Sequence, residues 1–192
     1  MTLRRGFASH AEKLAADVRA GLGIGATDQI DLVALAARRG IELVAADELV
    51  DRERLHELER LQAYAFSACT FEIGAKKFIV YNPLRDLARR RSDIAHELGH
   101  VILEHELDEV RELGDVTFRT CRADQEEEAT AFGGVLLLPR QLLLSSLRQG
   151  MEQAEIARRF QVTETMTRYR INITGVQRQI SAAARFRGPH KT

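Results

Sequence analysis

The stretch Ala95-His96-Glu97-Leu98-Gly99-His100 contains the pattern HExxH, and the interpretation of the whole chain starts from it. Its surroundings have the apolar spacing of a packed helix, at Ile94, Leu98, Val101 and Ile102. Residues four apart lie one turn along a helix on the same side, so His96 and His100 can direct imidazole nitrogens at one metal ion. Glu97 projects near that side, where it can take a proton from an attacking water and pass it to a leaving amine. The pattern therefore predicts a helix that carries a metal site.

Two other interpretations of this pattern exist. The helix could be amphipathic with two solvated histidines, or it could bind a metal without hydrolysing anything. A bare ion site does not need Glu97, whereas hydrolysis does, and this favours catalysis. Gly99 costs a helix about 1 kcal/mol relative to alanine, which indicates close approach of another segment at that point.

A catalytic zinc ion needs a third protein ligand, and the segment 126–134, EEEATAFGG, is the natural source. It has helical spacing, and Gly133 and Gly134 would let it pack closely beside the HExxH helix. Its three adjacent carboxylates, Glu126, Glu127 and Glu128, leave the ligand open on physical grounds, because acidic residues also favour a helix N-terminus.

Outward from these motifs, the chain reads as a mixture of helices and strands. Ser9 to Glu12 has the pattern of a capping box that opens a helix running to about Leu22. After Pro139 the spacing is helical throughout, and the middle segments resemble a helix-turn-helix with Gln161 where glycine is usual. The remaining elements are expected as helices at 30–39 and 47–61, a helix from about residue 84 that carries HExxH, a helix at 125–138, strands at 41–45, 64–71 and 77–81, a connection at 108–124, and helices at 140–148, 152–160 and 164–172.

The charge is unevenly distributed, although the formal net charge of the 192 residues is zero. Residues 94–128 contain three arginines against eleven acidic residues, a net charge of −8 that suits a cation site. Residues 139–192 contain ten basic residues against three glutamates, a net charge of +7 that is weakly suggestive of nucleic acid or an acidic partner.

Bulk properties predict a cytoplasmic protein that does not enter membranes. No apolar run reaches the 18 residues of a membrane span, and the first residues lack the apolar core of a secretory signal. Cys69 and Cys121 are too few for a disulfide framework, so both are expected as reduced, partly buried thiols.

AHELGH followed downstream by EEEATAFGGVLLLP resembles the ImmA/IrrE family of metallopeptidases, which are HExxH zincins of the gluzincin-like type. Counted back from Pro139, the ligand glutamate of the family falls on Glu126. The resemblance extends over most of the chain, including the opening RRGFASHAEKLAADVRAGLGI and the strand that ends in FIVYN. The family usually has an amide or acid where this chain has Thr130, whose hydroxyl can still accept a hydrogen bond from a ligand histidine.

The resemblance implies an α+β fold with a minimal zincin-like core. In this core a small twisted sheet packs on the HExxH helix and a glutamate-bearing helix, and a helical C-terminal module follows. We therefore expect a metallopeptidase domain at residues 1–138 and a helical, helix-turn-helix-like module at residues 139–192.

The resemblance also implies an activity: a zinc-dependent endopeptidase that cleaves a helix-turn-helix transcriptional repressor and so relieves repression in a mobile element, phage or stress response. One Zn²⁺ per chain would be held by His96, His100 and Glu126, with Glu97 as the catalytic base, although manganese or iron also suits such a site. The alternative is a DNA-binding transcriptional regulator with a structural or sensory metal site; a third interpretation is a protease-like sensor or toxin component without efficient turnover. Weak DNA contact is expected only through the basic C-terminal module.

Further residues outside the two motifs have expected roles. Residues 78–81 are expected to form an edge strand on which an extended substrate pairs. His105 follows His100 by five residues, so a continuing helix would turn it about 140° away from the site, as a surface or hydrogen-bonded histidine. Five side chains are candidates for the donor that stabilises an oxyanion: Tyr81, Arg119, His105, Tyr169 and Arg170.

Overall fold

A computed structural model describes residues 3–105, 109–113, 116–120 and 122–186, and for residues 109–113, 116–120, 184 and 186 it describes the backbone only. The first half of the chain runs through α1 (Phe7–Gly21), α2 (Leu32–Arg38), β1 (Ile41–Ala45), the 3-10 turn η1 (Ala46–Glu48), α3 (Arg52–Leu61), β2 (Ala68–Ile73) and β3 (Lys76–Tyr81). The second half contains α4 (Leu87–Ile102), β4 (Glu109–Leu113), β5 (Val116–Thr120), α5 (Ala123–Leu137), α6 (Arg140–Arg148), α7 (Gln153–Phe160), α8 (Glu164–Thr174) and α9 (Val176–Phe186). The predicted α+β class with a helical C-terminal part is confirmed.

The main sheet has the strand order β1-β3-β2, in which β1 pairs parallel and β2 antiparallel with β3. The β2–β3 hairpin turns at Gly74, which has φ +61° and so adopts a conformation that glycine reaches without strain. Because β3 is central, the prediction that residues 78–81 form an edge strand is wrong. The sequence pattern predicts that β2 and β3 pair as a hairpin. It does not show that β3 also pairs with the distant strand β1, and this second pairing makes β2, not β3, the edge strand.

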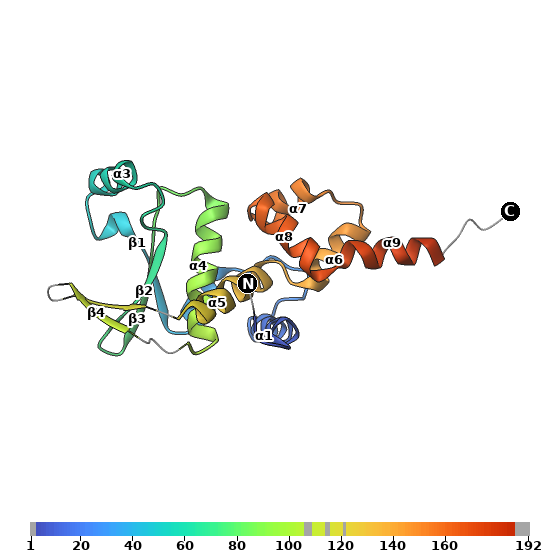
Figure 1. Cartoon of the computed structure of the whole chain (residues 1–192), viewed down its shortest axis with the longest axis horizontal. Helices are drawn as coiled ribbons and strands as arrows, with labels where there is room; N and C mark the ends of the chain where they lie inside the picture. The colour runs from blue at the N-terminus through green and yellow to red at the C-terminus, as the bar shows by residue number, and fades with distance from the viewer. Residues whose placement is uncertain (1–2, 106–108, 114–115, 121, 187–192) are drawn as a thin grey trace.

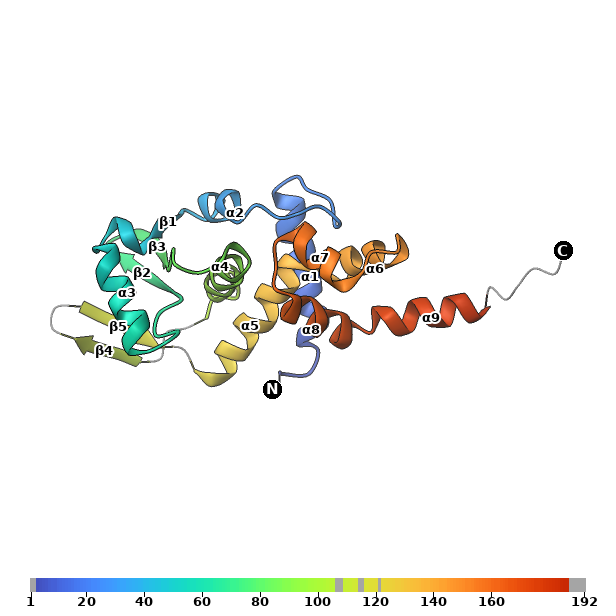
Figure 2. The same cartoon turned by 90° about the horizontal axis from the view of Figure 1, so that it is seen from above.

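The two faces of the sheet pack in different clusters. Ile79 of β3 is fully buried in the main core, together with α4 and α5. Val80 points the other way, into a small cluster with Leu55 of α3 and with Phe71 of β2. In both views α4 lies between the sheet and the C-terminal helices (Figure 1, Figure 2).

Helix α4 packs closely against α5, which crosses it at a large angle, and this pair forms the centre of the molecule (Figure 2). Asp86 caps α4 by accepting a hydrogen bond from the backbone N–H of Arg89. Helix α5 is buried on most sides between Ala129 and Leu137, because α1 and α8 cover it in addition to α4. No single helix in the described ranges is long and apolar enough to span a membrane, although α5 and α6, bent by 41°, pass that test of length and composition as a pair.

The C-terminal helices contain a helix-turn-helix made by α7 and α8. Gln161 between them adopts the left-handed conformation, with φ 52° and ψ 51°, so the turn forms without the usual glycine. Arg170 of α8 is buried and donates to Glu12 of α1 at 2.6 Å and to the backbone oxygen of Leu138 at 3.1 Å. These contacts cross the predicted boundary at residue 139; the division into two domains stays a prediction. Helix α9 extends away from the rest (Figure 1).

Two local predictions differ from the structure. Helix α1 begins at Phe7 with Gly6 as its N-cap, so Ser9 lies inside the helix and is not the start of a capping box. The segment predicted as a connection at residues 108–124 contains the antiparallel hairpin β4–β5. Its many charges concealed the strand pattern, and strand pairing is decided as much by neighbours as by local preference.

Candidate metal centre

The three predicted ligands come from the two central helices. His96 and His100 lie one turn apart on α4, and Glu126 lies in the first turn of α5. The side chain of His100 is 10% exposed, whereas that of Glu126 is 48% exposed, so the group is closed on the helix side and open to solvent on the other. An open side is what a catalytic metal site needs for water and substrate.

The donor atoms of these residues are spaced as ligands of one small cation. Nε2 of His96 lies 3.1 Å from Nε2 of His100, and Glu126 places Oε2 at 3.2 Å from His96 and Oε1 at 3.5 Å from His100. Ligands at about 2.05 Å around a tetrahedral zinc ion are separated by about 3.3 Å. One donor from each residue falls within 4.8 Å of the others, so the set fits a His₂Glu-type site.

Close contact between the helices sets this spacing. A Cβ on Gly99 would lie 3.1 Å from the backbone oxygen of Ala129, and a Cβ on Gly133 would lie 3.1 Å from backbone atoms of Ala95 and His96. The approach predicted at Gly99 is therefore confirmed, and α5 is the segment that approaches. Gly134 was expected to serve the same contact but faces the side chain of Arg170, 3.2 Å from its Cδ.

The electrostatics of the ligand group favour a bound cation. Hydrogen bonds with His100 and His96 hold the pKa of Glu126 well below its usual range. Burial opposes protonation of His96, but its hydrogen bond with Glu126 and the charges of Glu97 and Asp93 outweigh burial and raise its pKa. The anionic carboxylate of Glu126 beside two imidazole nitrogens is therefore a donor set that attracts a divalent cation.

Each histidine of the pair has a second contact through its other ring nitrogen. Nδ1 of His96 lies 3.3 Å from Oγ1 of Thr130, which is the hydrogen bond expected from the sequence. Nδ1 of His100 lies 3.0 Å from Nδ1 of His105, which the sequence interpretation had directed away from the site. Helix α4 ends at Ile102, so the helical projection does not apply to His105. Burial, together with the neighbouring His100, lowers the pKa of His105.

Glu97 lies outside the ligand group and contacts the sheet. Its Oε2 accepts a hydrogen bond of 2.6 Å from Oγ1 of Thr70 on the edge strand β2. Thr70 was missed by the sequence interpretation, because it precedes Glu97 by 27 residues and belongs to no motif. The contact places the carboxylate of Glu97 between the ligand residues and β2.

Two of the five candidate oxyanion donors are wrong. His105 contacts the ring of His100 on the side opposite Nε2, and Arg170 is engaged with Glu12 beside Gly134, two helical turns beyond Glu126. Tyr81 and Tyr169 stay predictions, and the side chain of Arg119 lies outside the described structure.

The two cysteines differ in what can be said of them. Cys69 is a free, half-buried thiol whose Sγ lies 3.9 Å from the backbone oxygen of Val80. Burial, and then the negative charge of Glu97, raise its pKa to about 12, so it is a protonated structural thiol. Cys121 lies outside the described residues.

Comparison with known proteins identifies a family and a similar fold. Residues 36–172 match the model of the Peptidase M78 family, described as the IrrE N-terminal-like domain. A solved structure titled "Mycobacterium tuberculosis transcriptional regulator" is similar in fold, with a TM-score of 0.52 and 19% sequence identity over 88% of this chain. The chain spans about half of that structure, 47% of its length. No curated protein sequence matches the chain.

Proposed function

The chain belongs to the Peptidase M78 family of IrrE N-terminal-like domains, that is, to the ImmA/IrrE family, and we propose that it is a zinc-dependent endopeptidase that cleaves a helix-turn-helix transcriptional repressor. The observation that carries the proposal is the spacing between the side-chain donor atoms of His96, His100 and Glu126, which lie 3.1 to 3.5 Å apart. A fourth side chain, the carboxylate of Glu97, lies beside this group and outside it. A structural zinc site is closed by four protein ligands, usually cysteines, whereas this group has three ligands and an exposed side.

His96, His100 and Glu126 would hold the ion. When bound, zinc polarises the scissile carbonyl and lowers the pKa of a water molecule. Glu97 accepts the proton of the attacking water at its carboxylate and delivers it to the nitrogen of the leaving amine. Thr70 holds Oε2 of Glu97 during this exchange, which keeps the carboxylate between the metal ligands and the sheet.

The substrate would bind as an extended strand along β2. The described strands leave one edge of β2 without a pairing partner, and Thr70 of β2 contacts Glu97 directly. A peptide paired with this edge would pass beside the catalytic carboxylate, with its backbone held by strand hydrogen bonds. Strand β2 thus replaces residues 78–81 as the proposed docking edge.

The test combines metal analysis with cleavage of a purified helix-turn-helix repressor. We expect one zinc per chain in the native protein and in Glu97→Gln, and loss of zinc in Glu126→Ala. The native protein should cut the repressor, and both Glu97→Gln and Glu126→Ala should fail to cut it. Glu127→Ala is the matched control on the same helix and should keep both zinc and activity. Absence of zinc from the native protein, or retention of zinc by Glu126→Ala, would contradict the ligand assignment.

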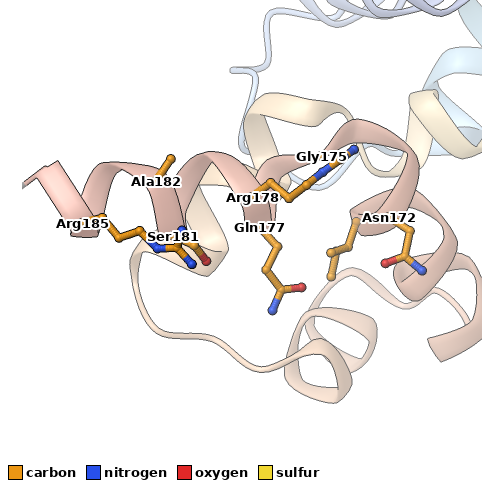
Figure 3. Close-up of a pocket in the computed structure, with 8 residues that line it drawn as sticks. Asn172, Gly175, Gln177, Arg178, Ser181, Ala182 and Arg185 are labelled. Carbon is orange, nitrogen blue, oxygen red and sulfur yellow. The ribbon is translucent and has the colours of Figure 1, made fainter.

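A weak contact with DNA is a second candidate, favoured by the helix-turn-helix geometry of α7 and α8. Beside it, residues of α8 and α9 line an open hollow of about 650 Å³ that contains Arg178 and Arg185 (Figure 3). If these two arginines contact phosphates, binding to duplex DNA should weaken about tenfold between 50 and 200 mM salt. Substitution of both by alanine should remove that dependence. Equal binding by the native and substituted proteins would rule out this surface.

A further inference from the structure

The chain reverses direction after α4 and returns His105 to the metal centre. Glu104 adopts a left-handed conformation with φ 54°, and the backbone N–H of His105 donates to the backbone oxygen of His100 at 3.0 Å. The side chain of His105 is consequently only 5% exposed. Left-handed backbone is uncommon for a residue other than glycine, so this turn has a conformational cost that the contacts of His105 must offset.

The ring contact between His105 and His100 constrains their protons. The two Nδ1 atoms lie 3.0 Å apart, so one of them must carry a hydrogen and the other must accept it. Nε2 of His100 belongs to the ligand group, and a metal ligand nitrogen carries no proton. The proton of His100 is then on Nδ1, and Nδ1 of His105 is the acceptor.

His105 must in turn carry its own proton on Nε2. This atom is buried without a hydrogen-bond partner in the described structure, and Oε2 of Glu128 lies 3.5 Å from it. Glu128 is held from outside by Arg4, whose Nε lies 2.8 Å from Oε1. A movement of a few tenths of an ångström would complete a chain of contacts from His100 through His105 to Glu128 and Arg4.

We propose that His105, supported by Glu128, is a positioning residue that holds the ring of His100 with Nε2 directed at the metal. The inference rests on the proposed function, because it needs a metal at this group. The two ligand histidines are supported differently: His96 by the hydroxyl of Thr130, and His100 by a histidine backed by a carboxylate. Such outer contacts fix the tautomer and the orientation of a ligand histidine, and their loss typically weakens metal binding 10- to 100-fold.

The test measures zinc affinity by competition with a chelator, together with the visible spectrum of the cobalt-substituted protein. His105→Leu fills the space but removes the acceptor, and should weaken zinc binding about 10- to 100-fold and change the cobalt spectrum. His105→Asn can place its amide oxygen where Nδ1 lies, and should stay within a few-fold of the native affinity. His56→Leu, an exposed histidine on α3, is the control and should change nothing.

Glu128→Gln provides a second measurement that leaves His105 in place, and it should weaken zinc binding by a few-fold. Equal affinities for His105→Leu and the native protein would overturn the proposal, as would equal weakening by leucine and asparagine, which would indicate packing alone. An unchanged affinity in Glu128→Gln would remove the role of Glu128. A native protein that binds no zinc would instead refute the proposed function, so the two failures are distinguishable.

Discussion

Substitution of Gly133 by alanine tests whether contact between α4 and α5 sets the metal site. The new Cβ would lie 3.1 Å from three backbone atoms of the HExxH helix, namely C and O of Ala95 and N of His96. Helix backbone cannot rotate aside as a side chain can, so α5 must move away from α4 by a few tenths of an ångström. Because α5 carries Glu126, this movement lengthens the distances from its carboxylate to both histidines.

The size of the effect follows from two opposed contributions. Alanine in place of glycine stabilises a helix interior by about 1 kcal/mol. Overpacking in a close-packed contact costs about 1 to 3 kcal/mol. We therefore expect Gly133→Ala to lower the free energy of unfolding of the metal-free protein by between zero and about 2 kcal/mol. Zinc affinity should fall about tenfold, because the longer distances from Glu126 to the histidines weaken the site. Tenfold corresponds to ~1.4 kcal/mol of binding free energy, which lies within the cost of the overpacked contact.

Gly134→Ala is the matched control, one residue along the same helix. Its Cβ would meet Cδ of the buried Arg170 at 3.2 Å and no backbone atom of α4, so it does not push α5 away from α4. This variant should keep native zinc affinity, and the gain of about 1 kcal/mol from alanine in the helix should offset much of the cost of the contact with Arg170. Urea unfolding and chelator competition measure both quantities. If the two alanine variants behaved alike in both assays, the reasoning from the helix contact would be refuted.

Three further predictions follow from contacts around the site and the core. Thr70→Val removes the hydrogen bond to Glu97 and should lower kcat/KM about 10- to 100-fold at unchanged zinc affinity. Thr70→Ser should retain activity, and equal rates for the valine and serine variants would contradict the positioning of Glu97 by Thr70. Burial raises the pKa of the Cys69 thiol to about 12, so Cys69 should react with iodoacetamide at pH 8 about 1,000-fold more slowly than a thiol of pKa 9.0. Peptide mapping of the labelled protein measures this rate, and rapid labelling would show that the thiol is not held protonated. Arg170→Met leaves Glu12 without its buried partner and should cost about 2 to 3 kcal/mol in a single urea transition of the whole chain; two separate transitions would favour independent domains.

The parts of the site that depend on local spacing were predictable from the sequence. The histidines of HExxH face one point because the helix repeat requires it, and Gly99 indicated a close neighbour because it weakens the helix that contains it. Glu126 could not be chosen over Glu127 and Glu128 on physical grounds, and the choice came from the family resemblance. The structure brings Glu126 to the histidines.

The parts that depend on chain reversal or on distant pairing were not predictable. His105 was misplaced because its angle was projected along a helix that ends at Ile102, and no glycine marks the left-handed turn at Glu104. Thr70 reaches Glu97 only because β2 is an edge strand beside α4, which requires the parallel pairing of β1 with β3. Parallel pairing needs a long crossover, and local sequence does not specify its partner.

These observations separate the proposed site into a fixed half and an open half. Gly99 precedes His100 directly, and Gly133 lies against the backbone of His96. The short distance between α4 and α5 therefore fixes the positions of the ligand residues on the helix side of the site. Thr130 and His105 then orient the two rings, again from these helices or the turn after α4. The opposite side consists of Glu97 and the edge of β2, where the described structure provides no further strand. A peptide bound there would complete the sheet without moving any ligand, so substrate can vary while the geometry of the metal group stays constant.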